Sequence, residues 1–345
     1  MAALATLALL GAVAVGWGLS TIYGAGPGGE GDRTVVLRRG AGLSEIASAL
    51  DRADVIESAT LFTAFAQATG AASQLRAGEY AFPTGASMAE VMYRIRRGEI
   101  VRHFVTVPEG VTSEMAVEIL NRSPVLTGVA PVPPEGAILP ETYQVSRGDD
   151  RAAVLERMMD ARERVLNRLW ANRARDLPFS TREQAVTLAS IVEKETGVAS
   201  ERPRVAAVYV NRLRQGIPLQ ADPTVVYGVS RGRPLGRGLR RSELDANTPY
   251  NTYRNQGLTP TPIANPGAAS LAAVINPPRT DELFFVADGT GGHAFARTLA
   301  EHNANVARWR QIERGSTGAA GTAATPSTRT PSTPITTPST SSTQP

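Results

Sequence analysis

The stretch STREQAVTLASIVEKETG, residues 180–197, carries an acidic side chain in the middle of its own apolar face. At about 100° per residue on an α-helix, Glu195 lies within about 20° of Leu188, whereas Glu193 lies about 140° from Leu188. Helix stripes that face a protein core do not normally carry acids. Glu195 is therefore the first candidate for chemistry in this chain.

The ends of this helix carry recognisable signals. Ser180 followed by Glu183 predicts a capping box, and Gly197 predicts a left-handed residue at the end. Glu195 then lies in the last turn, where desolvation and the negative end of the helix dipole both raise the pKa of a carboxyl group. A protonated glutamic acid near neutral pH is what acetal cleavage requires of a general acid. The alternative is a glutamate whose head group reaches solvent past the helix end.

Glycoside hydrolysis normally needs a second carboxylate. Glu193 is a poor partner because it leaves the helix about 160° away from Glu195. Candidates in other segments are Asp222, in LQADPTVVYG (219–228), and Glu141, in LPETY (139–143), although each could equally cap a turn or a helix. A single acid would suffice for an enzyme in which a hydroxyl group of the sugar attacks in place of water.

Three polar loops resemble the rim of a sugar-binding site: PYNTY (249–253), PIANPG (262–267) and GGHAF (291–295). Asn, Tyr and His side chains bind sugars by stacking and hydrogen bonding. The candidates for substrate binding are Gln220, Asp222, Tyr250, Asn251, Asn265 and His293. A separate basic loop is expected to be a solvated surface, the alternative being an anion site for lactyl carboxylates or lipid phosphate; it contains Arg231, Arg233, Arg237, Arg240 and Arg241.

Composition excludes several functions. The chain has 345 residues, of which 42% are apolar and 20% charged, as in folded proteins. The net charge of +4 comes without a stripe of basic and aromatic residues, so no nucleic-acid partner is expected. The absence of cysteine excludes disulfides, a thiolate nucleophile and a Cys-ligated zinc site. The three histidines lack metal-ligand spacing, and neither a metal nor a cofactor is expected.

Both ends of the chain differ from its middle. Residues 1–23 are predicted to form a transmembrane anchor, because roughly 22 of them in a row carry no charge, enough for a bilayer at about 1.5 Å per residue. A buried core helix is the alternative. Arg33, Arg38 and Arg39 follow the span, which by charge alone would keep the body in the cytoplasm, although long domains are translocated largely regardless of charge. The Gly-rich linker 24–33 and the Ser/Thr/Pro tail 315–345 are expected not to pack.

The pattern between these ends predicts an α+β fold. Strand 34–37, helix 43–52, helix 58–68 and strand 78–82 give a βααβ unit. Short strands and turns are expected between 216 and 283. The other predicted elements are helix 88–97, strand 103–107, a helix from Ser113, the long helix 151–173, helix 201–215, strand 283–287 and helix 298–313.

The chain resembles the YceG-like, or MltG, family of endolytic murein transglycosylases. The segments that carry the resemblance are ASIVEKETGVASER (189–202), NRL (211–213), LQADPTVVYG (219–228), YNTY (250–253), NPG (265–267), FVADG (285–289) and GHAF (292–295). In that family the second Glu of the Glu-Lys-Glu motif is catalytic, which corresponds to Glu195. Two departures are Glu141, where Asp is more usual, and a start without a basic cytoplasmic stub.

The resemblance implies a domain order and a location. It implies a LysM-like subdomain with its connecting helix over 34–102 and a YceG-like catalytic domain over 103–314. It also implies a single-pass anchor in the cell inner membrane with the catalytic domain in the periplasm.

The predicted function is that of a lytic transglycosylase that cleaves the MurNAc-β-1,4-GlcNAc bond of nascent peptidoglycan, leaves 1,6-anhydroMurNAc ends and limits strand elongation. Expected partners are glycan strands, the cytoplasmic membrane and peptidoglycan polymerases. The alternatives are a non-catalytic, membrane-tethered peptidoglycan-binding scaffold and an inverting muramidase that uses a second carboxylate.

Overall fold

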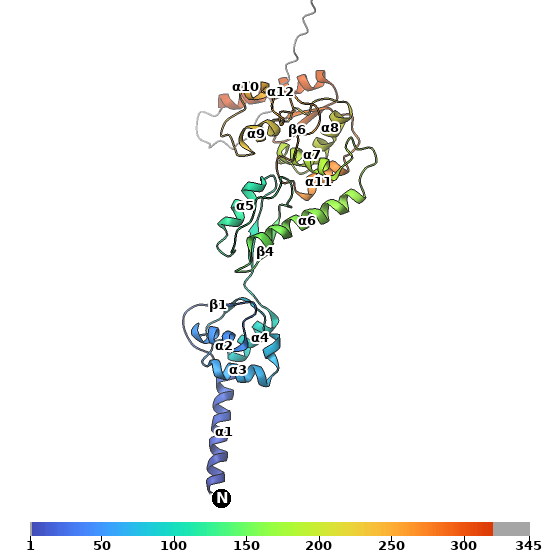
Figure 1. Cartoon of the computed structure of the whole chain (residues 1–345). Coiled ribbons are helices and arrows are strands. Elements are labelled where there is room, and N and C mark those ends of the chain that lie inside the picture. The colour runs from blue at the N-terminus through green and yellow to red at the C-terminus, as the bar shows by residue number, and fades with distance from the viewer. Residues whose placement is uncertain (1, 320–345) are drawn as a thin grey trace, which may run out of the picture. The chain divides into compact units, whose positions relative to one another are not determined.

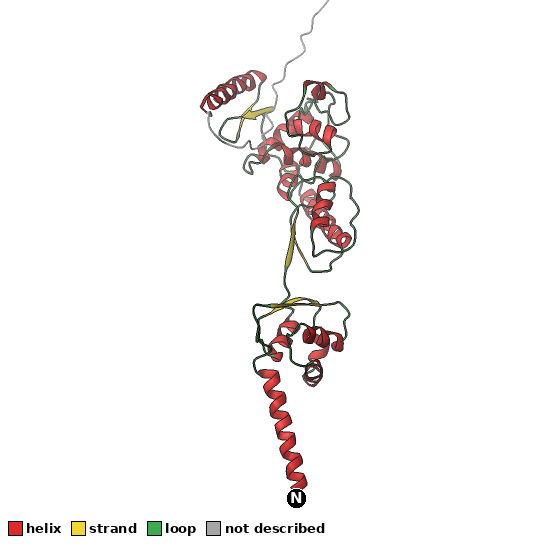
Figure 2. Ribbon diagram, turned by 90° about the vertical axis from the view of Figure 1, so that its left-hand side faces the viewer, coloured by secondary structure: helices red, strands yellow, loops and turns green. Residues whose placement is uncertain are grey.

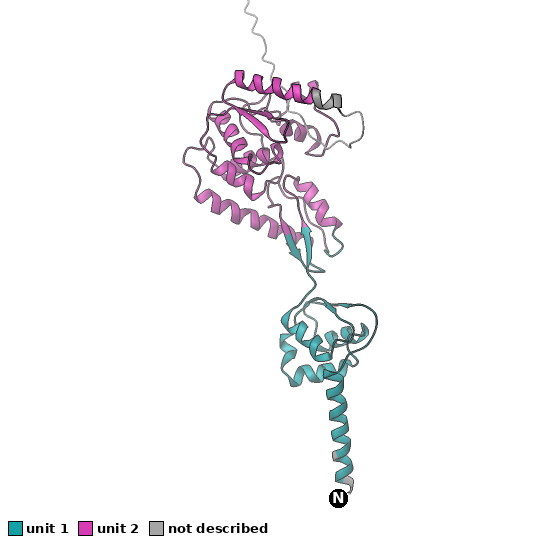
Figure 3. Cartoon of the chain, turned by 180° about the vertical axis from the view of Figure 1, so that it is seen from behind, with its two compact units in different colours: residues 1–105, 123–127, 143–150 teal, residues 106–122, 128–142, 151–345 magenta. Residues whose placement is uncertain are grey.

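The structure is a computed structural model that describes residues 2–319 of the chain, and the predicted tail lies outside the described residues from 320 onward. It divides into two compact units, coloured separately in Figure 3: Met1–Val105 with Ser123–Thr127 and Tyr143–Asp150, and Thr106–Arg122 with Gly128–Thr142 and Arg151–Pro345. Helices predominate, and the strands of the described part form three two-stranded sheets (Figure 2). The α+β class is therefore confirmed.

The first unit contains the predicted βααβ order (Figure 1). Strands β1 and β2 are antiparallel, with Val35 opposite Tyr80. Helices α2 and α3 bury Leu50 and Phe62 completely against them. The elements of this unit are α1 (Ala2–Tyr23), β1 (Arg33–Leu37), α2 (Leu43–Arg52), α3 (Ala59–Ala68), the 3₁₀ turn η1 (Ala71–Gln74), β2 (Gly78–Phe82), α4 (Met88–Arg97), β3 (His103–Thr106) and β4 (Thr142–Val145).

The Gly-rich segment after α1 packs against its own unit, contrary to the expectation for a flexible linker. Gly26 donates its backbone N–H to the Gly85 carbonyl at 3.1 Å, and the Gly85 N–H donates to the Pro27 carbonyl at 3.2 Å. A Cβ atom on Gly26 would lie 2.2 Å from the Ala86 carbonyl oxygen. Glycine is needed here for close approach of two backbones rather than for flexibility.

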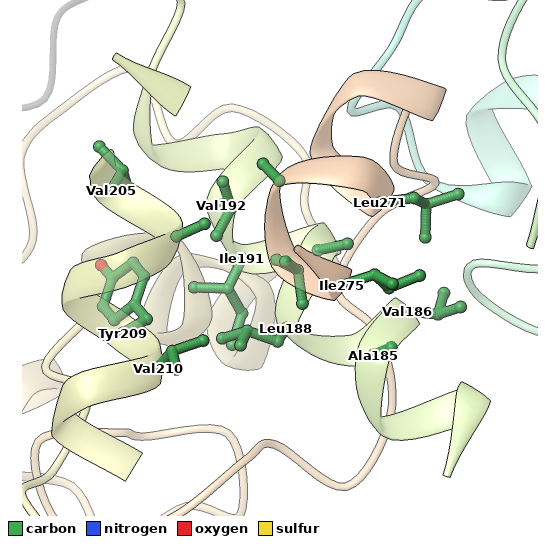
Figure 4. Close-up of a cluster of buried hydrophobic side chains, with 14 of the residues drawn as sticks. Ala185, Val186, Leu188, Ile191, Val192, Val205, Tyr209, Val210, Leu271 and Ile275 are labelled. Carbon is green, nitrogen blue, oxygen red and sulfur yellow. The ribbon is translucent and has the colours of Figure 1, made fainter. Parts of the chain in front are cut away.

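The second unit is built around α7, α8 and α11. Figure 4 shows Leu188 and Ile191 of α7 lying between Tyr209 of α8 and Ile275 of α11, and all four side chains are buried. Strands β5 and β6 pair antiparallel beside α8. The elements are α5 (Ser113–Arg122), α6 (Arg151–Ala171), α7 (Arg182–Glu195), α8 (Arg202–Arg214), α9 (Asp222–Ser230), α10 (Arg241–Asp245), α11 (Ala268–Ile275), β5 (Phe284–Ala287), β6 (His293–Ala296) and α12 (Leu299–Ala319).

The ends of α7 differ from the predicted ones. The N-cap is Thr181, whose hydroxyl accepts from the Gln184 N–H at 3.2 Å, while the Gln184 side chain accepts from the Thr181 N–H at 3.1 Å. The predicted capping box of Ser180 and Glu183 is wrong by one residue, because Thr and Gln serve the same hydrogen bonds. At the other end Thr196 is already extended and Gly197 has no positive φ. Glu195 is therefore the last helical residue.

The region between 216 and 283 contains three helices, joined by loops and turns, where short strands and turns were expected. Helices α9, α10 and α11 have nine, five and eight residues. Segments this short contain too few turns for an apolar periodicity to be read, and α11, AASLAAVI, is apolar on almost every side. Tertiary burial rather than pattern decides these helices.

Candidate active site

Glu195 is the last residue of α7, and as a whole residue it is partly exposed while its carboxyl group is surrounded by protein. The hydroxyl of Tyr209, on α8, donates a hydrogen bond to Glu195 Oε1 at 2.7 Å. Burial raises the pKa of Glu195 to about 7, and the charge of Asp222 acts in the same direction, while the Tyr209 hydrogen bond and the charge of Arg212 oppose the shift. Glu195 is therefore partly protonated at neutral pH.

A second carboxyl group, Asp222, lies near enough to act electrostatically on Glu195. Asp222 is the first residue of α9 and is 7% exposed. Its Oδ1 accepts a hydrogen bond from the Tyr253 hydroxyl at 2.6 Å, and burial raises its pKa. Two carboxyl–tyrosine pairs thus come together from α7, α8, α9 and the loop that follows α10.

Arg212 provides the positive charge of this cluster. It is 7% exposed, and burial lowers its pKa. Its Nε donates to the Leu283 carbonyl at 2.7 Å, and its Nη1 donates to the Leu219 carbonyl at 2.8 Å and to Gln220 Oε1 at 3.3 Å. The candidate residue Gln220 is therefore held by Arg212, with its backbone in the left-handed region at φ 54°.

The candidates Tyr250 and Asn251 lie in one loop but differ in accessibility. Asn251 is fully buried, and its amide donates to the carbonyls of Leu244 and Ala246 at 2.8 and 2.7 Å. Its Oδ1 accepts the Tyr253 N–H at 2.9 Å, so Asn251 shapes the loop that delivers Tyr253. Tyr250 is partly exposed, and its hydroxyl lies 2.9 Å from Thr261 Oγ1.

Asn265 is likewise fully buried. Its Nδ2 donates to the Val111 carbonyl at 3.1 Å, and its Oδ1 accepts the Ile138 N–H at 3.2 Å. Burial raises the pKa of Glu135, whose Oε1 lies 3.3 Å from the same Nδ2. Asn265 thus joins three distant segments of the chain and lies within the scaffold of the site.

The two other acids considered as partners are occupied elsewhere. Glu193 accepts the Gly267 N–H at 2.9 Å and lies 3.6 Å from Arg202, so its carboxylate ties the end of α7 to the loop before α11. Glu141 is exposed, and its charge acts on Glu109. Asp222 is the one predicted partner candidate whose charge acts on Glu195.

His293 is connected to the cluster through aromatic rings. Its Nδ1 lies 2.7 Å from Glu201 Oε2, and its backbone N–H donates to Glu201 Oε1 at 2.8 Å. The ring of Phe285 meets His293 edge to face at 5.4 Å and meets Tyr209 at 5.8 Å. Glu201 therefore fixes the orientation of His293, and the ring of Phe285 lies between His293 and Tyr209.

Sequence reasoning missed Tyr209, Arg212 and Tyr253 as members of the site. Tyr209 fits the apolar spacing of its helix, and nothing in that spacing reveals where its hydroxyl points. Tyr253 stands in the YNTY motif beside the two residues that were selected. No group of three His, Cys, Asp or Glu in the described part of the chain could hold a metal ion.

The site and the fold define a class of protein: the chain belongs to the YceG-like family, whose model matches residues 35–308. The resemblance seen in the motifs is thereby confirmed. The chain is 30% identical over 296 residues to the endolytic murein transglycosylase of Bacillus subtilis, covering 76% of this chain and 81% of that protein. It is 26% identical over 324 residues to the protein of that name from Streptococcus pneumoniae serotype 2, covering 79% of this chain and 58% of the relative.

A solved structure has the same fold. The crystal structure of a putative yceG-like protein from Listeria monocytogenes matches with a TM-score of 0.50 and 24% identity. The match covers 79% of this chain and 98% of the Listeria chain. It therefore extends over most of the described residues.

Proposed function

We propose that this chain is a peptidoglycan lytic transglycosylase with Glu195 as its catalytic acid and base. The names of its relatives supply the substrate class and the activity. The observation that carries the chemistry is the carboxyl group of the partly exposed residue Glu195, which is hydrogen-bonded by Tyr209 and has its pKa raised to about 7. Such a group donates and accepts a proton at neutral pH with little cost in either direction.

The reaction needs only one such group. Glu195 gives its proton to the oxygen between MurNAc and GlcNAc as the bond from that oxygen to C1 of MurNAc breaks, leaving an oxocarbenium-like C1. The ionised Glu195 then takes the proton of the C6 hydroxyl as its oxygen bonds to C1, which closes the 1,6-anhydro ring. Tyr209 occupies Oε1, so Oε2, which has no hydrogen-bond partner among the described residues, is the oxygen that serves the substrate.

The surrounding residues have distinct roles in this proposal. The charges of Asp222 and Arg212 act on the pKa of Glu195 in opposite directions: Asp222 favours the protonated form and Arg212 favours the ionised form. Tyr250, Gln220 and His293 are partly accessible and contact the sugar chain. Asn251 and Asn265 support the loops that hold these groups, since both amides are bonded within the protein.

Digestion of purified sacculi tests the reaction. The expected products carry 1,6-anhydro ends, identified by mass spectrometry. Reducing muramic ends would instead indicate hydrolysis. The second candidate is therefore an inverting muramidase, which the electrostatic proximity of Asp222 to Glu195 favours. In that case Asp222→Asn should abolish cleavage, whereas the one-acid mechanism leaves this variant partly active.

The pH dependence of cleavage reports the pKa of Glu195. Because the acid must be protonated to start the reaction, kcat/KM is expected to fall as the pH rises through about 7. Tyr209→Phe removes a hydrogen bond that favours the ionised form, so the alkaline limb should move to higher pH. Tyr80→Phe is the matched control, because Tyr80 is also buried and bonded, to the Arg76 carbonyl at 2.8 Å, but lies in the first unit. An alkaline limb that stays in place in Tyr209→Phe would contradict this assignment.

We further propose that α1 anchors the protein in the cell inner membrane with the catalytic unit in the periplasm. The segment Leu4–Tyr23 is long and apolar enough to cross a membrane, and little of it is buried within the protein. The βααβ unit would then act as a LysM-like module on peptidoglycan, near the polymerases that make the strands. Resistance of the catalytic unit to externally added protease in spheroplasts would overturn this topology.

A further inference from the structure

The basic loop after α9 uses most of its arginines for its own structure. Arg233 lies 2.5 Å from a carboxylate oxygen of Glu118, Arg237 lies 2.5 Å from Glu243, and Arg241 lies 2.8 Å from Asp245. Arg240 donates its backbone N–H to Glu243 at 2.8 Å. Arg231 is exposed, and among the described residues it has no carboxylate partner. A solvated surface loop would also leave Arg231 exposed, so its backbone and its aromatic contacts decide whether the side chain has a further role.

The backbone of Arg231 makes this residue type unexpected. Arg231 caps the C-terminus of α9 with φ 55° and ψ 39°, in the left-handed region, and Gly232 follows with φ 80°. Glycine is the common residue at such a position because a Cβ atom is strained there. Because an arginine at this position costs more conformational energy than a glycine, we expect its side chain to make a contact that offsets the cost.

The side chain of Arg231 lies over two aromatic rings. Its guanidinium carbon is 5.8 Å from the ring centroid of Tyr227 and 5.8 Å from that of Tyr250, and the two centroids are 5.0 Å apart. The Tyr227 hydroxyl donates to Glu135 Oε2 at 3.3 Å, and the Tyr250 hydroxyl lies 2.9 Å from Thr261 Oγ1. Both rings are therefore held through their hydroxyl groups, and they orient the guanidinium by cation–π contacts. The Arg231 side chain also hydrogen-bonds Tyr227, and its other N–H donors have no carboxylate partner among the described residues.

This platform is connected to the catalytic acid by one helix and one loop. Helix α9 begins with Asp222 and ends beside Arg231, roughly 13 Å farther along at about 1.5 Å per residue. The loop after α10 accompanies it, with Tyr253 on Asp222 at one end and Tyr250 on Tyr227 at the other. The guanidinium of Arg231 lies over Tyr227 and Tyr250, the members of this arrangement farther from Asp222, so it is placed to meet a neighbouring part of the same strand.

We propose that Arg231 binds a carboxylate of a stem peptide carried by the glycan strand, and so makes this enzyme prefer strands with intact peptides. The proposal rests on the proposed function. The sugar backbone of peptidoglycan is neutral, and its stem peptides end in and carry carboxylates. A planar guanidinium with several free donors matches a carboxylate through paired, charge-assisted hydrogen bonds.

Kinetics with three soluble substrates test the proposal: strands with intact stem peptides, the same strands with every carboxylate converted to a neutral methylamide, and amidase-treated strands that keep only the lactyl carboxylate. Arg231→Gly removes the side chain and relieves the backbone, so the fold should be kept. On intact strands its KM is expected to rise about tenfold, which corresponds to about 1.4 kcal/mol, with kcat within about twofold of wild type. On the other two substrates it should match wild type.

The controls separate binding from structure. Arg175→Ala, which removes another exposed arginine, should behave as wild type on every strand. Arg231→Lys should recover part of the lost affinity. An equal loss on neutral strands, or no loss on intact strands, would overturn the proposal, and a loss on amidase-treated strands would assign the site to the lactyl carboxylate instead. Sedimentation of intact strands with the Arg231→Gly and Glu195→Gln double variant, against Glu195→Gln alone, measures the same contact even if the proposed cleavage fails.

Discussion

Glu195→Gln is expected to lower the rate of strand cleavage by about a thousandfold or more, the range of a general acid that also acts as the base. Glutamine has the same shape and still accepts the hydrogen bond that Tyr209 donates at 2.7 Å. It has no acidic proton to give and no carboxylate to take one back. The rate is measured by release of soluble fragments from sacculi.

Glu193→Gln is the matched control for this loss. Its carboxylate lies two residues away in the same turn and accepts the Gly267 N–H at 2.9 Å, a bond that an amide oxygen retains. Most of the cleavage should therefore remain in Glu193→Gln. If Glu195→Gln cleaved at the wild-type rate, Glu195 would not be the catalytic acid. If the wild-type protein bound sacculi without cleaving them, a non-catalytic, peptidoglycan-binding scaffold would be the better description of this protein.

The stability of Glu195→Gln provides an independent check of the raised pKa. A glutamate has a pKa of about 4.3 in an unfolded chain and Glu195 one of about 7 in the fold, so the folded state holds the proton more tightly. The stability that this proton provides is complete below about pH 4 and is lost as the pH rises through 7. Wild type therefore loses this stability between pH 5 and pH 8, whereas Glu195→Gln has no such proton to lose. The stability of the variant minus that of wild type should increase from pH 5 to pH 8, measured by thermal unfolding. A smaller difference at pH 8 than at pH 5 would contradict the raised pKa.

Arg212→Ala is expected to lower the free energy of unfolding by about 3–5 kcal/mol. The Arg212 guanidinium bonds the carbonyls of Pro218, Leu219 and Leu283, at 3.2, 2.8 and 2.7 Å, and its side chain is 7% exposed. Removal leaves these acceptors without a donor and leaves a cavity between α8, β5 and the turn before α9. Chemical denaturation with a fluorescence readout measures the change.

Arg214→Ala distinguishes this effect from the loss of any arginine on α8. Arg214 is about one-third exposed and pairs with Asp176 at 3.0 Å, so its removal should cost less than about 1 kcal/mol. Equal losses in the two variants would mean that the buried hydrogen bonds of Arg212 contribute little to the fold.

The sequence predicted amphipathic helices and four of the strands well, and it missed short helices without an apolar stripe. Helices 43–52 and 88–97 have the predicted bounds because each has a clear apolar stripe, and Ser87 and Gly98 also mark the two ends of the second. Helices α9 and α11 were missed because eight or nine residues carry too little periodicity. The linker 24–33 was misjudged because glycine can indicate close backbone approach as well as flexibility.

The candidate site shows the same division. The position of Glu195 on its helix follows from local geometry alone. The sequence also predicted the direction of its pKa shift, but the causes of that shift are burial and the charge of Asp222, which come from the packing of distant segments. Asn251 and Asn265 were selected as substrate contacts, and the structure places them in the interior, where their amides bond to backbone groups. From the sequence alone, a polar loop residue that supports the loop cannot be distinguished from one that faces a ligand.

The sequence by itself determined which helix carries the acid, that Glu193 points elsewhere, and which family the chain resembles. Only the tertiary structure decided that Tyr209 bonds Glu195, that Asp222 and Arg212 act on its charge, and that Arg231 lies over two tyrosine rings. The physical reason is distance along the chain. A hydrogen bond or a charge contact between residues that are far apart in the sequence depends on how the helices pack. The pattern of residue types along the chain does not determine that packing.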